Sequence, residues 1–195
     1  PILLFAIFLR FYRVNTSEFD FDQASIYRLA YDAIHHGLWP VTNSTASLGF
    51  ANAPGELYLV MIPAAFSANP IYGTYVVSLL ASIAILITYI FITRYYGRLA
   101  GTIATLLSAT AAIPLYYERF LWQPNIMYPF VILFMFMLFI GVVERRKGWF
   151  GPALILLAIL YQTHGTTLTL AVPLLFACGM AFRTIRWRDV FYGIV

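Results

Sequence analysis

The feature that most constrains this chain is a run of 35 residues, from Gly148 to Phe182, that contains no Lys, Arg, Asp or Glu. As a single helix the run would extend for roughly 50 Å at ~1.5 Å per residue, whereas the hydrocarbon core of a bilayer is ~30 Å thick. The run is therefore expected to fold back on itself. The polar stretch QTHGTT, from Gln162 to Thr167, contains a glycine among hydroxyl-bearing residues and is the predicted turn.

The composition of the whole chain agrees with a membrane location. The chain is 62% hydrophobic and 10% charged, with a mean hydropathy of +0.80, whereas a soluble domain has about 25% charged residues. The single cysteine, Cys178, lies in an apolar run and cannot form an internal disulfide, so it does not indicate a redox compartment. The composition predicts an integral membrane protein.

Three further uncharged runs have the length of a membrane span. They contain between 19 and 24 residues, and they are Ile71–Thr93, Leu99–Tyr117 and Phe120–Val143. Pro124 and Asn125 place the effective start of the last run near Ile126. With the two halves of the Gly148–Phe182 run, five full spans are predicted. Pro1–Leu9 is too short to cross a bilayer and is interpreted as the end of a truncated first helix.

The predicted fold is an all-α, polytopic membrane bundle that forms part of one transmembrane domain. Its first external loop is long enough to contain helices of its own, which are expected to lie at the membrane interface. The predicted segments are residues 1–9 as the end of the first helix, 10–70 as the external loop, 71–182 as the five spans, and 183–195 as the cytoplasmic-side start of a continuation.

Charged residues divide unevenly between the two ends of this bundle. With five spans, the connections at 94–98 and 144–147 and the segment after 183 fall on one face, which holds eight of the twelve basic residues and two acids. The opposite face holds the other six acids. Because cytoplasmic loops are enriched in Lys and Arg, the acidic face is predicted to be external. Two Asn-x-Ser/Thr sequences, at Asn15 and Asn43, lie on that face and fit either glycosylation or turns.

Two helices are predicted inside the external loop. The first is ended by Gly37 and Pro40, and apolar residues recur along one of its faces at spacings of three and four: Ala24, Tyr27, Tyr31, Ile34 and Leu38. The second, Leu57–Phe66, has ten residues, which is too short to cross a bilayer. It is predicted to be an interfacial or re-entrant helix.

The stretch EFDFDQAS places three carboxylates within eight residues of a chain that has only eight acids. Part of this cluster has a structural explanation, because Asp20 is a good N-cap and Gln23 three residues later completes a capping box. Asp22 in the first turn would favour the helix dipole, and Arg10 could pair with Glu18. Helix capping does not need three acids, so a functional role is predicted for a remaining carboxylate at the membrane surface.

Four segments of the chain carry a family resemblance. They are RFYR with FDFDQAS, NAPGELYLVMIPAAFSANPIYGTYVVSLL, YYERFLWQPNIMYPF and YQTHGTTLTLAVPLLF. In this order they resemble the GT-C superfamily of glycosyltransferases that use polyprenyl-phosphate sugars, especially the aminoarabinose transferase of lipid A and the protein O-mannosyltransferases. Family members are longer, so the chain is interpreted as an N-terminal fragment.

The resemblance implies inverting transfer of a sugar from a polyprenyl-phosphate donor to an acceptor on the external face. An external carboxylate would remove the proton of the acceptor as the sugar leaves its lipid phosphate. Asp22 aligns with the family Asp and is the predicted base, in a groove walled by Phe19 and Phe21, with Asp20 as the alternative base. The predicted substrate-binding residues are Asn52, Glu56, Arg119, Gln123, Asn125 and His164.

Several positions depart from the family pattern. Gln23 and Gln123 stand where relatives often have an acid, and His164 stands where a lysine is common. Relatives have a lysine that contacts phosphate before the loop proline, whereas in this chain Ala53 precedes Pro54. Arg119, an external cation, is therefore predicted to hold the donor phosphate, and His164 is either a second phosphate contact or a turn residue.

Some of the candidate site residues also fit a structural role, and the chain also fits other functions. Asn52–Gly55 fits a turn, and Pro124–Asn125 fits a helix start. The expected partners are the lipid-linked donor, a lipid, glycan or protein acceptor, and the lipids of the cell membrane, but no nucleic acid. The site residues include no metal ligand, and a divalent cation stays open as a cofactor that the sequence does not require. The alternative function is a transporter or flippase for a lipid-linked precursor, against which the scarcity of charges in the spans argues; a membrane scaffold is a third.

Overall fold

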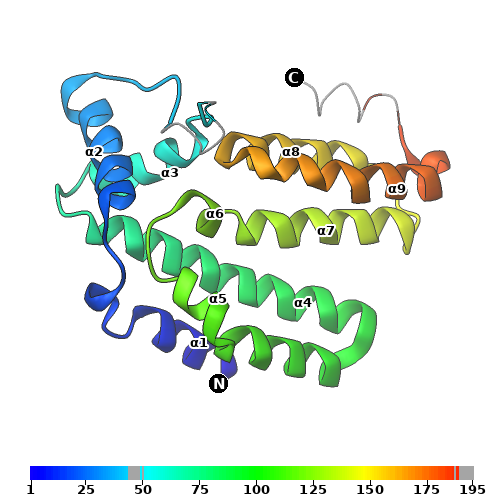
Figure 1. Ribbon diagram of the computed structural model, residues 1–195. Coiled ribbons are helices and arrows are strands. Elements are labelled where there is room, and N and C mark those ends of the chain that lie inside the picture. The colour runs from blue at the N-terminus through cyan, green and yellow to red at the C-terminus, as the bar shows by residue number, and fades with distance from the viewer. Residues whose placement is uncertain (44–48, 50, 187, 189–195) are drawn as a thin grey trace.

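The computed structural model describes residues 1–43, 49, 51–186 and 188, and in this part of the chain the regular structure is helical (Figure 1). The described residues form a bundle of nine α-helices, so the prediction of an all-α bundle is confirmed. The 3₁₀ segments are η1 (Val14–Thr16), η2 (Gly165–Leu170) and η3 (Phe182–Thr184). The α-helices are α1 (Ile2–Phe11), α2 (Phe21–His36), α3 (Gly55–Ala64), α4 (Ile71–Thr110), α5 (Ala112–Tyr117), α6 (Gln123–Ile126), α7 (Tyr128–Val142), α8 (Phe150–Thr163) and α9 (Ala171–Ala181).

Two of the described helical segments, Ile71–Thr110 and Gly165–Thr184, are long and apolar enough to cross a membrane. The other apolar helices, α1, α3, α7 and α8, are shorter. The longest of these, α7, has 15 residues, which corresponds to about 22 Å at ~1.5 Å per residue. The five full spans expected from the sequence are thus reduced to two segments of sufficient length, because prolines and glycines interrupt the uncharged runs.

The helix α4 consists of two arms joined at Gly97, which has φ 88° and ψ 168°. This conformation is open to glycine and strongly disfavoured for residues with a Cβ atom. The second arm turns back alongside the first (Figure 1). The arms approach so closely that a Cβ atom added to Gly101 would lie 2.1 Å from Thr93 Oγ1. The turn lies within the connection predicted at 94–98.

The second arm of α4 ends at Thr110, before the end of the predicted run at Tyr117. Ala111 is extended, with φ −61° and ψ 122°, and the short helix α5 follows it. Pro114 accounts for this break, because it has no N–H to donate to the carbonyl of Thr110 and its ring would clash with that carbonyl. The predicted span Leu99–Tyr117 is therefore two helices and not one.

Prolines also determine where the next helices begin. Pro124 lies in the first turn of α6 and Pro129 in the first turn of α7, where the missing N–H has no helical partner to lose. The helix α7 therefore begins at Tyr128, two residues beyond the predicted start. The predicted fold-back at Gln162–Thr167 is confirmed, since α8 ends at Thr163 and the chain continues through η2 into α9.

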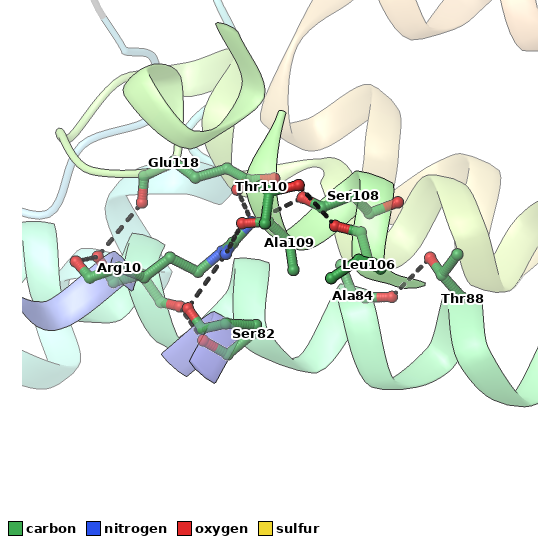
Figure 2. A network of polar contacts seen from close by, with 11 residues as sticks. Arg10, Ser82, Ala84, Thr88, Leu106, Ser108, Ala109, Thr110 and Glu118 are labelled. Atoms are coloured by element: carbon green, nitrogen blue, oxygen red, sulfur yellow. Dashed lines mark hydrogen bonds and ion pairs between the residues drawn. The ribbon is translucent and has the colours of Figure 1, made fainter. Parts of the chain in front are cut away.

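Arg10 joins α1 to the end of α4 and to the residue that follows α5 (Figure 2). Its side chain is completely buried and donates to the carbonyls of Ser108 and Ala109, at 3.2 and 3.3 Å, and to the carboxylate of Glu118. The two carbonyls belong to the last turn of α4, where carbonyls lack helical partners and a cation favours the helix dipole. The suggested pairing of Arg10 with Glu18 is therefore wrong.

The two helices predicted in the external loop are confirmed as α2 and α3. Their packing differs from the prediction, however, because Ala24 is exposed and Leu38 is 65% exposed. Tyr27 of the predicted face is buried, and the other buried side chains of α2 are Gln23, Ile26, Ala30 and Ala33. Small alanines in this stripe let α3 pack closely, which a search for large apolar residues does not detect.

The elements separate into two ends of the bundle (Figure 1). The helices α2, α3 and α6 lie at one end with the junction of α8 and η2, and we call this the α2/α3 end. The turn at Gly97, the connection between α7 and α8, and the end of α9 lie at the other. The acidic stretch and the predicted substrate-binding residues belong to segments of the α2/α3 end.

Candidate functional site

The acidic stretch begins α2 through the predicted capping box. Asp20 is the N-cap, and its side chain accepts a hydrogen bond from the Phe21 amide at 2.7 Å. The side chain of Gln23 in turn accepts from the Asp20 amide at 2.7 Å. Gln23 points back into the capping box and is buried, whereas its neighbour Asp22 is exposed in the first turn of α2. The structural role expected of Asp20 is confirmed.

Asp22 lines a pocket of about 330 Å³ at the α2/α3 end. The carboxylates of Glu18, Asp20 and Asp22 all line it. We call this the acidic pocket, and its other lining residues are Phe21, Gln23, Tyr116, Tyr117, Phe120 and Trp122. The structure therefore brings the start of α2 together with the segment that joins α5 to α6, which is almost one hundred residues away in the chain.

The aromatic wall of the acidic pocket differs from the predicted one. Phe21 lines the pocket, but Phe19 lines a separate hollow beside η1. The larger part of the wall comes from the segment 116–122, in which the rings of Tyr117 and Trp122 are stacked with centroids 6.1 Å apart. Sequence reasoning missed this wall, although the density of aromatic residues in YYERFLW was its signal.

A hydrogen bond ties the aromatic wall to the acidic stretch. The hydroxyl of Tyr116 donates to the carboxylate of Glu18, and this carboxylate raises the pKa of Tyr116 above its ordinary value. Glu18 thus has a partner that holds it in place. Of the three carboxylates, Asp20 is engaged in capping and Glu18 in this contact, so Asp22 is the one that neither interaction occupies.

Glu56 lies in the first turn of α3 and is completely buried. Its Oε2 atom accepts a hydrogen bond from the side-chain Nδ2 of Asn43 at 2.7 Å, and the backbone N–H of Asn43 donates to the backbone carbonyl of Asn52 at 2.8 Å. These contacts connect Asn43 to Asn52 and to the first turn of α3. Asn43 is itself buried, so the alternative that its side chain accepts a glycan is wrong for this conformation.

The carboxyl group of Glu56 is poorly compensated within the described part of the chain. Its Oε1 atom is buried and has no hydrogen-bond partner there. The pKa of Glu56 is raised to about 8: burial is the largest cause, the hydrogen bond from Asn43 lowers the pKa, and the charge of Asp22 raises it. Glu56 therefore holds a proton at neutral pH, and it lies close enough to Asp22 for the negative charge of Asp22 to favour that proton.

A second pocket, of about 360 Å³, lies beside the start of α3. The start of α3 and the end of α8 lie very close together here: a Cβ atom added to Gly55 would lie 2.6 Å from the carbonyl oxygen of Gln162. We call this the neutral pocket, and it is lined by Val41, Thr42, Ala51, Asn52, Ala53, Pro54, Tyr161, Gln162 and Gly165. Of the predicted substrate-binding residues, Asn52 is the one that lines it.

Gln123 and Asn125 are buried in α6. The amide of Asn125 donates to the carbonyl of Phe120 at 3.1 Å, which stabilises the turn into the helix. Neither residue is among those that line the acidic pocket. The helix start expected at Pro124 is confirmed, and a role of these two amides in substrate binding stays a prediction.

The two predicted phosphate contacts lie outside the acidic pocket. Arg119 is half-buried and donates through Nη2 to the carbonyl of Tyr12 at 2.6 Å. His164 caps η2, and its Nδ1 atom accepts from the amide of Thr166 at 3.2 Å. Because Nδ1 is the acceptor, the neutral ring carries its proton on Nε2. The turn role of His164 is thus observed, and its Nε2–H is a donor that this turn does not use.

These residues together form an acid-rich, aromatic-walled site whose free carboxylate is Asp22. Such a site suits proton removal from a hydroxyl or amine that lies against the rings. Among the described residues, no group of three or more His, Cys, Asp and Glu side chains is arranged to hold a metal ion. Acid–base chemistry by side chains is what the described geometry offers directly.

Comparison of the chain with protein-family models, with curated proteins and with solved structures finds no match. The geometry at the α2/α3 end and the order of the four resembling segments are therefore the features from which a function is proposed.

Proposed function

We propose that this protein is an integral membrane glycosyltransferase of the GT-C type, which transfers a sugar from a polyprenyl-phosphate donor to an acceptor on the external face of the cell membrane. Asp22 is the base in this inverting reaction, and Asp20 is the alternative. The observation that carries the proposal is the acidic pocket, where the carboxylate of Asp22 takes part neither in the capping box made by Asp20 nor in the contact of Glu18 with Tyr116.

The shape and chemistry of the acidic pocket support this function. Aromatic rings such as those of Tyr117 and Trp122 offer flat apolar faces against which the C–H face of a sugar ring or an apolar acceptor group packs. The carboxylate of Asp22 would then remove a proton from the acceptor hydroxyl or amine as that atom attacks the anomeric carbon. The bond from the anomeric carbon to the phosphate oxygen breaks, and the polyprenyl phosphate leaves with the bonding electrons.

The distribution of apolar and basic residues supports the membrane location. Two helical segments have the length of a span, and the basic groups of 94–98 and 145–147 lie at the end of the bundle away from α2 and α3 (Figure 1). Lys and Arg accumulate on the cytoplasmic side of membrane proteins. This arrangement supports an external position for the acidic pocket, on the side where a lipid-linked sugar donor would be presented.

The donor phosphate needs a cation or N–H donors near the acidic pocket. Arg119 follows Glu118 in the segment that forms the aromatic wall. The Nε atom of its guanidinium group is buried and has no hydrogen-bond partner in the described part of the chain. The Nε2–H of His164 is the second available donor at this end. We propose Arg119 as the principal contact, because a guanidinium binds phosphate with charge and with several N–H groups.

A transporter or flippase is the second candidate, and one observation favours it. Arg10 of α1 and Glu118, which follows α5, form a buried ion pair. Buried ionisable groups in membrane proteins often mark a transport path. Arg10, however, also donates to two carbonyls at the end of α4 (Figure 2). A side chain held by three partners of the scaffold is better explained as a structural tie than as a moving charge.

The proposal is tested by the turnover of the chain in membranes or nanodiscs with a panel of radiolabelled polyprenyl-phosphate sugars. Asp22→Asn keeps the shape of the side chain but cannot accept a proton, so turnover is expected to fall by about 10²–10⁴-fold. The matched control is Asp32→Asn, which removes a carboxylate of the same helix that pairs with Arg28 and His36; it is expected to retain turnover.

The melting temperature of each variant separates catalysis from folding. Asp20→Asn is expected to be mild, because Asn caps a helix as well as Asp does, whereas Asp20→Ala costs about 1 kcal/mol of local stability. Loss of activity in Asp20→Asn with retention in Asp22→Asn would exchange the two roles. Full activity of both variants contradicts the proposed mechanism.

A further inference from the structure

The neutral pocket is built from two segments of the chain that contain no formal charge. From Ala33 to Gly55 there is no Lys, Arg, Asp or Glu, and the same is true from Gly148 to Phe182. The described residues that line the pocket all belong to these two segments. Its charge therefore contrasts with that of the acidic pocket, where three carboxylates meet.

The polar groups of the neutral pocket are hydroxyls and amides. Thr42, Asn52, Tyr161 and Gln162 line it, and each of these side chains can both donate and accept hydrogen bonds. Sugar hydroxyl groups also donate and accept, so the two sets match. A ligand with an ammonium or carboxylate group would find no counter-charge among these lining residues, so the water that it gives up on binding would not be replaced by an ion pair.

The acid nearest in sequence to this lining is Glu56, and it does not supply a counter-charge. Its carboxyl group is buried in the first turn of α3 and is held by Asn43, in the loop that lines the pocket. At neutral pH it is protonated, because burial raises its pKa to about 8. The charge of Asp22 also acts on Glu56, so the start of α3, where Pro54 lines the neutral pocket, lies near a carboxylate of the acidic pocket.

We propose that the neutral pocket binds the sugar ring of the donor, and that this sugar is uncharged and hydroxyl-bearing rather than an amino sugar or a uronic acid. The inference rests on the proposed function, because it places the donor sugar beside the carboxylate that activates the acceptor. It adds the class of sugar, which the four resembling sequence segments do not determine.

The test measures binding of free methyl glycosides to the purified chain in nanodiscs by saturation-transfer NMR and calorimetry. The panel pairs neutral hexosides and pentosides with their amino and uronate counterparts. We expect each neutral ring that binds to do so at least a few-fold (about threefold or more) more tightly than its charged counterparts, since a charged group loses part of its hydration in the pocket without gaining a counter-charge.

Two variants locate the binding. Gln162→Ala removes one amide and is expected to weaken neutral-sugar binding about fivefold, the value of a typical hydrogen bond. Thr42→Asp adds a carboxylate at an exposed position of the lining, so it leaves folding unaffected and is expected to shift the preference toward amino sugars. Asp32→Asn, outside both pockets, is the control and should bind as the parent chain does.

The outcomes separate this inference from the proposed function. If charged rings bind as tightly as neutral ones, if no ring binds, or if Thr42→Asp leaves the preference unchanged, the inference is overturned even where Asp22→Asn abolishes transfer. If Asp22→Asn keeps full transfer activity while the neutral pocket shows the expected preference, the catalytic proposal fails and the pocket remains a neutral-sugar site.

Discussion

At the residue scale, Glu56 is the group whose environment departs most from its ordinary state. It is completely buried, one of its oxygens is held by Asn43, and the other has no partner in the described part of the chain. A buried carboxyl group avoids the cost of desolvating a charge by remaining protonated. The charge of Asp22, which lines the acidic pocket, acts on the same residue, so the protonation of Glu56 is linked to the charge of that pocket.

The raised pKa of Glu56 predicts a pH-dependent stability. Its pKa is about 8 in the folded chain against an ordinary value of 4.5, so between these values the folded chain keeps a proton that the unfolded chain has released. Stability should therefore fall as the pH rises from about 4.5 to 8 and level off above that. Glu56→Gln is neutral at every pH, so its melting temperature relative to the parent chain should increase toward pH 8.

Melting temperatures of both proteins between pH 5 and 9 check this expectation. Each unit of pKa shift corresponds to about 1.4 kcal/mol, so a shift of this size is readily detected. Asp32→Asn serves as the control and should follow the parent chain. A constant difference between Glu56→Gln and the parent chain across this range would show that Glu56 is not protonated in the folded state.

At the scale of elements, residues at the turns and ends of helices determine how the helices are arranged. The hairpin in α4 depends on Gly97, and the end of its second arm is held by Arg10, which supplies donors to carbonyls of the last turn (Figure 2). Between these two points the arms pack through the close contact of Gly101 with Thr93. A backbone conformation at one residue thus determines where two apolar segments meet.

Gly97→Ala is expected to destabilise the protein by about 1–3 kcal/mol, because its positive φ with extended ψ is open to glycine and strained for alanine. Thermal or denaturant unfolding in a fixed detergent measures this change. Gly179→Ala is the matched control, since Gly179 lies inside α9 and a Cβ atom there would meet nothing within 4 Å. That control should be neutral or stabilising by up to about 1 kcal/mol; equal effects of the two variants would contradict the role of Gly97.

At the scale of the whole molecule, the bundle has two chemically different ends. The α2/α3 end contains both pockets, and the other end contains the basic connections near Gly97 and Glu144 (Figure 1). At the basic end, Arg94 binds the carboxylate of Glu144 through two hydrogen bonds of 2.6 and 2.8 Å. This contact ties the α4 hairpin to the end of α7 and keeps part of the positive charge in a defined position.

The proposed orientation predicts the accessibility of single cysteines in cells. Asn43 and Glu118 are buried, so the exposed residue Asn69 is the better external reporter and the exposed residue Arg146 the internal one. In a Cys178→Ala background, Asn69→Cys should react with an impermeant thiol reagent in intact cells, and Arg146→Cys only after permeabilisation. Labelling of Arg146→Cys in intact cells would reverse the orientation and place the acidic pocket on the cytoplasmic side.

The sequence by itself determined the features that depend on neighbouring residues. The capping box at Asp20, the turn within 94–98, the helix start at Pro124 and the fold-back at Gln162–Thr167 were all predicted. They were predictable because a cap, a glycine or a proline acts on the backbone within about one turn. The all-α class followed from the long apolar runs for a similar reason, since a run of span length inside a bilayer satisfies its backbone hydrogen bonds within itself as a helix.

Only the tertiary structure decided which distant residues meet. Arg10 binds Glu118, 108 residues away, although Glu18 lies closer in the sequence. The aromatic wall at Tyr117 and Trp122 reaches the acidic stretch only because α1, α4 and α5 pack together, and the buried face of α2 is set by the close approach of α3. Such contacts depend on how whole helices pack, and the order of residues along one helix does not contain that information.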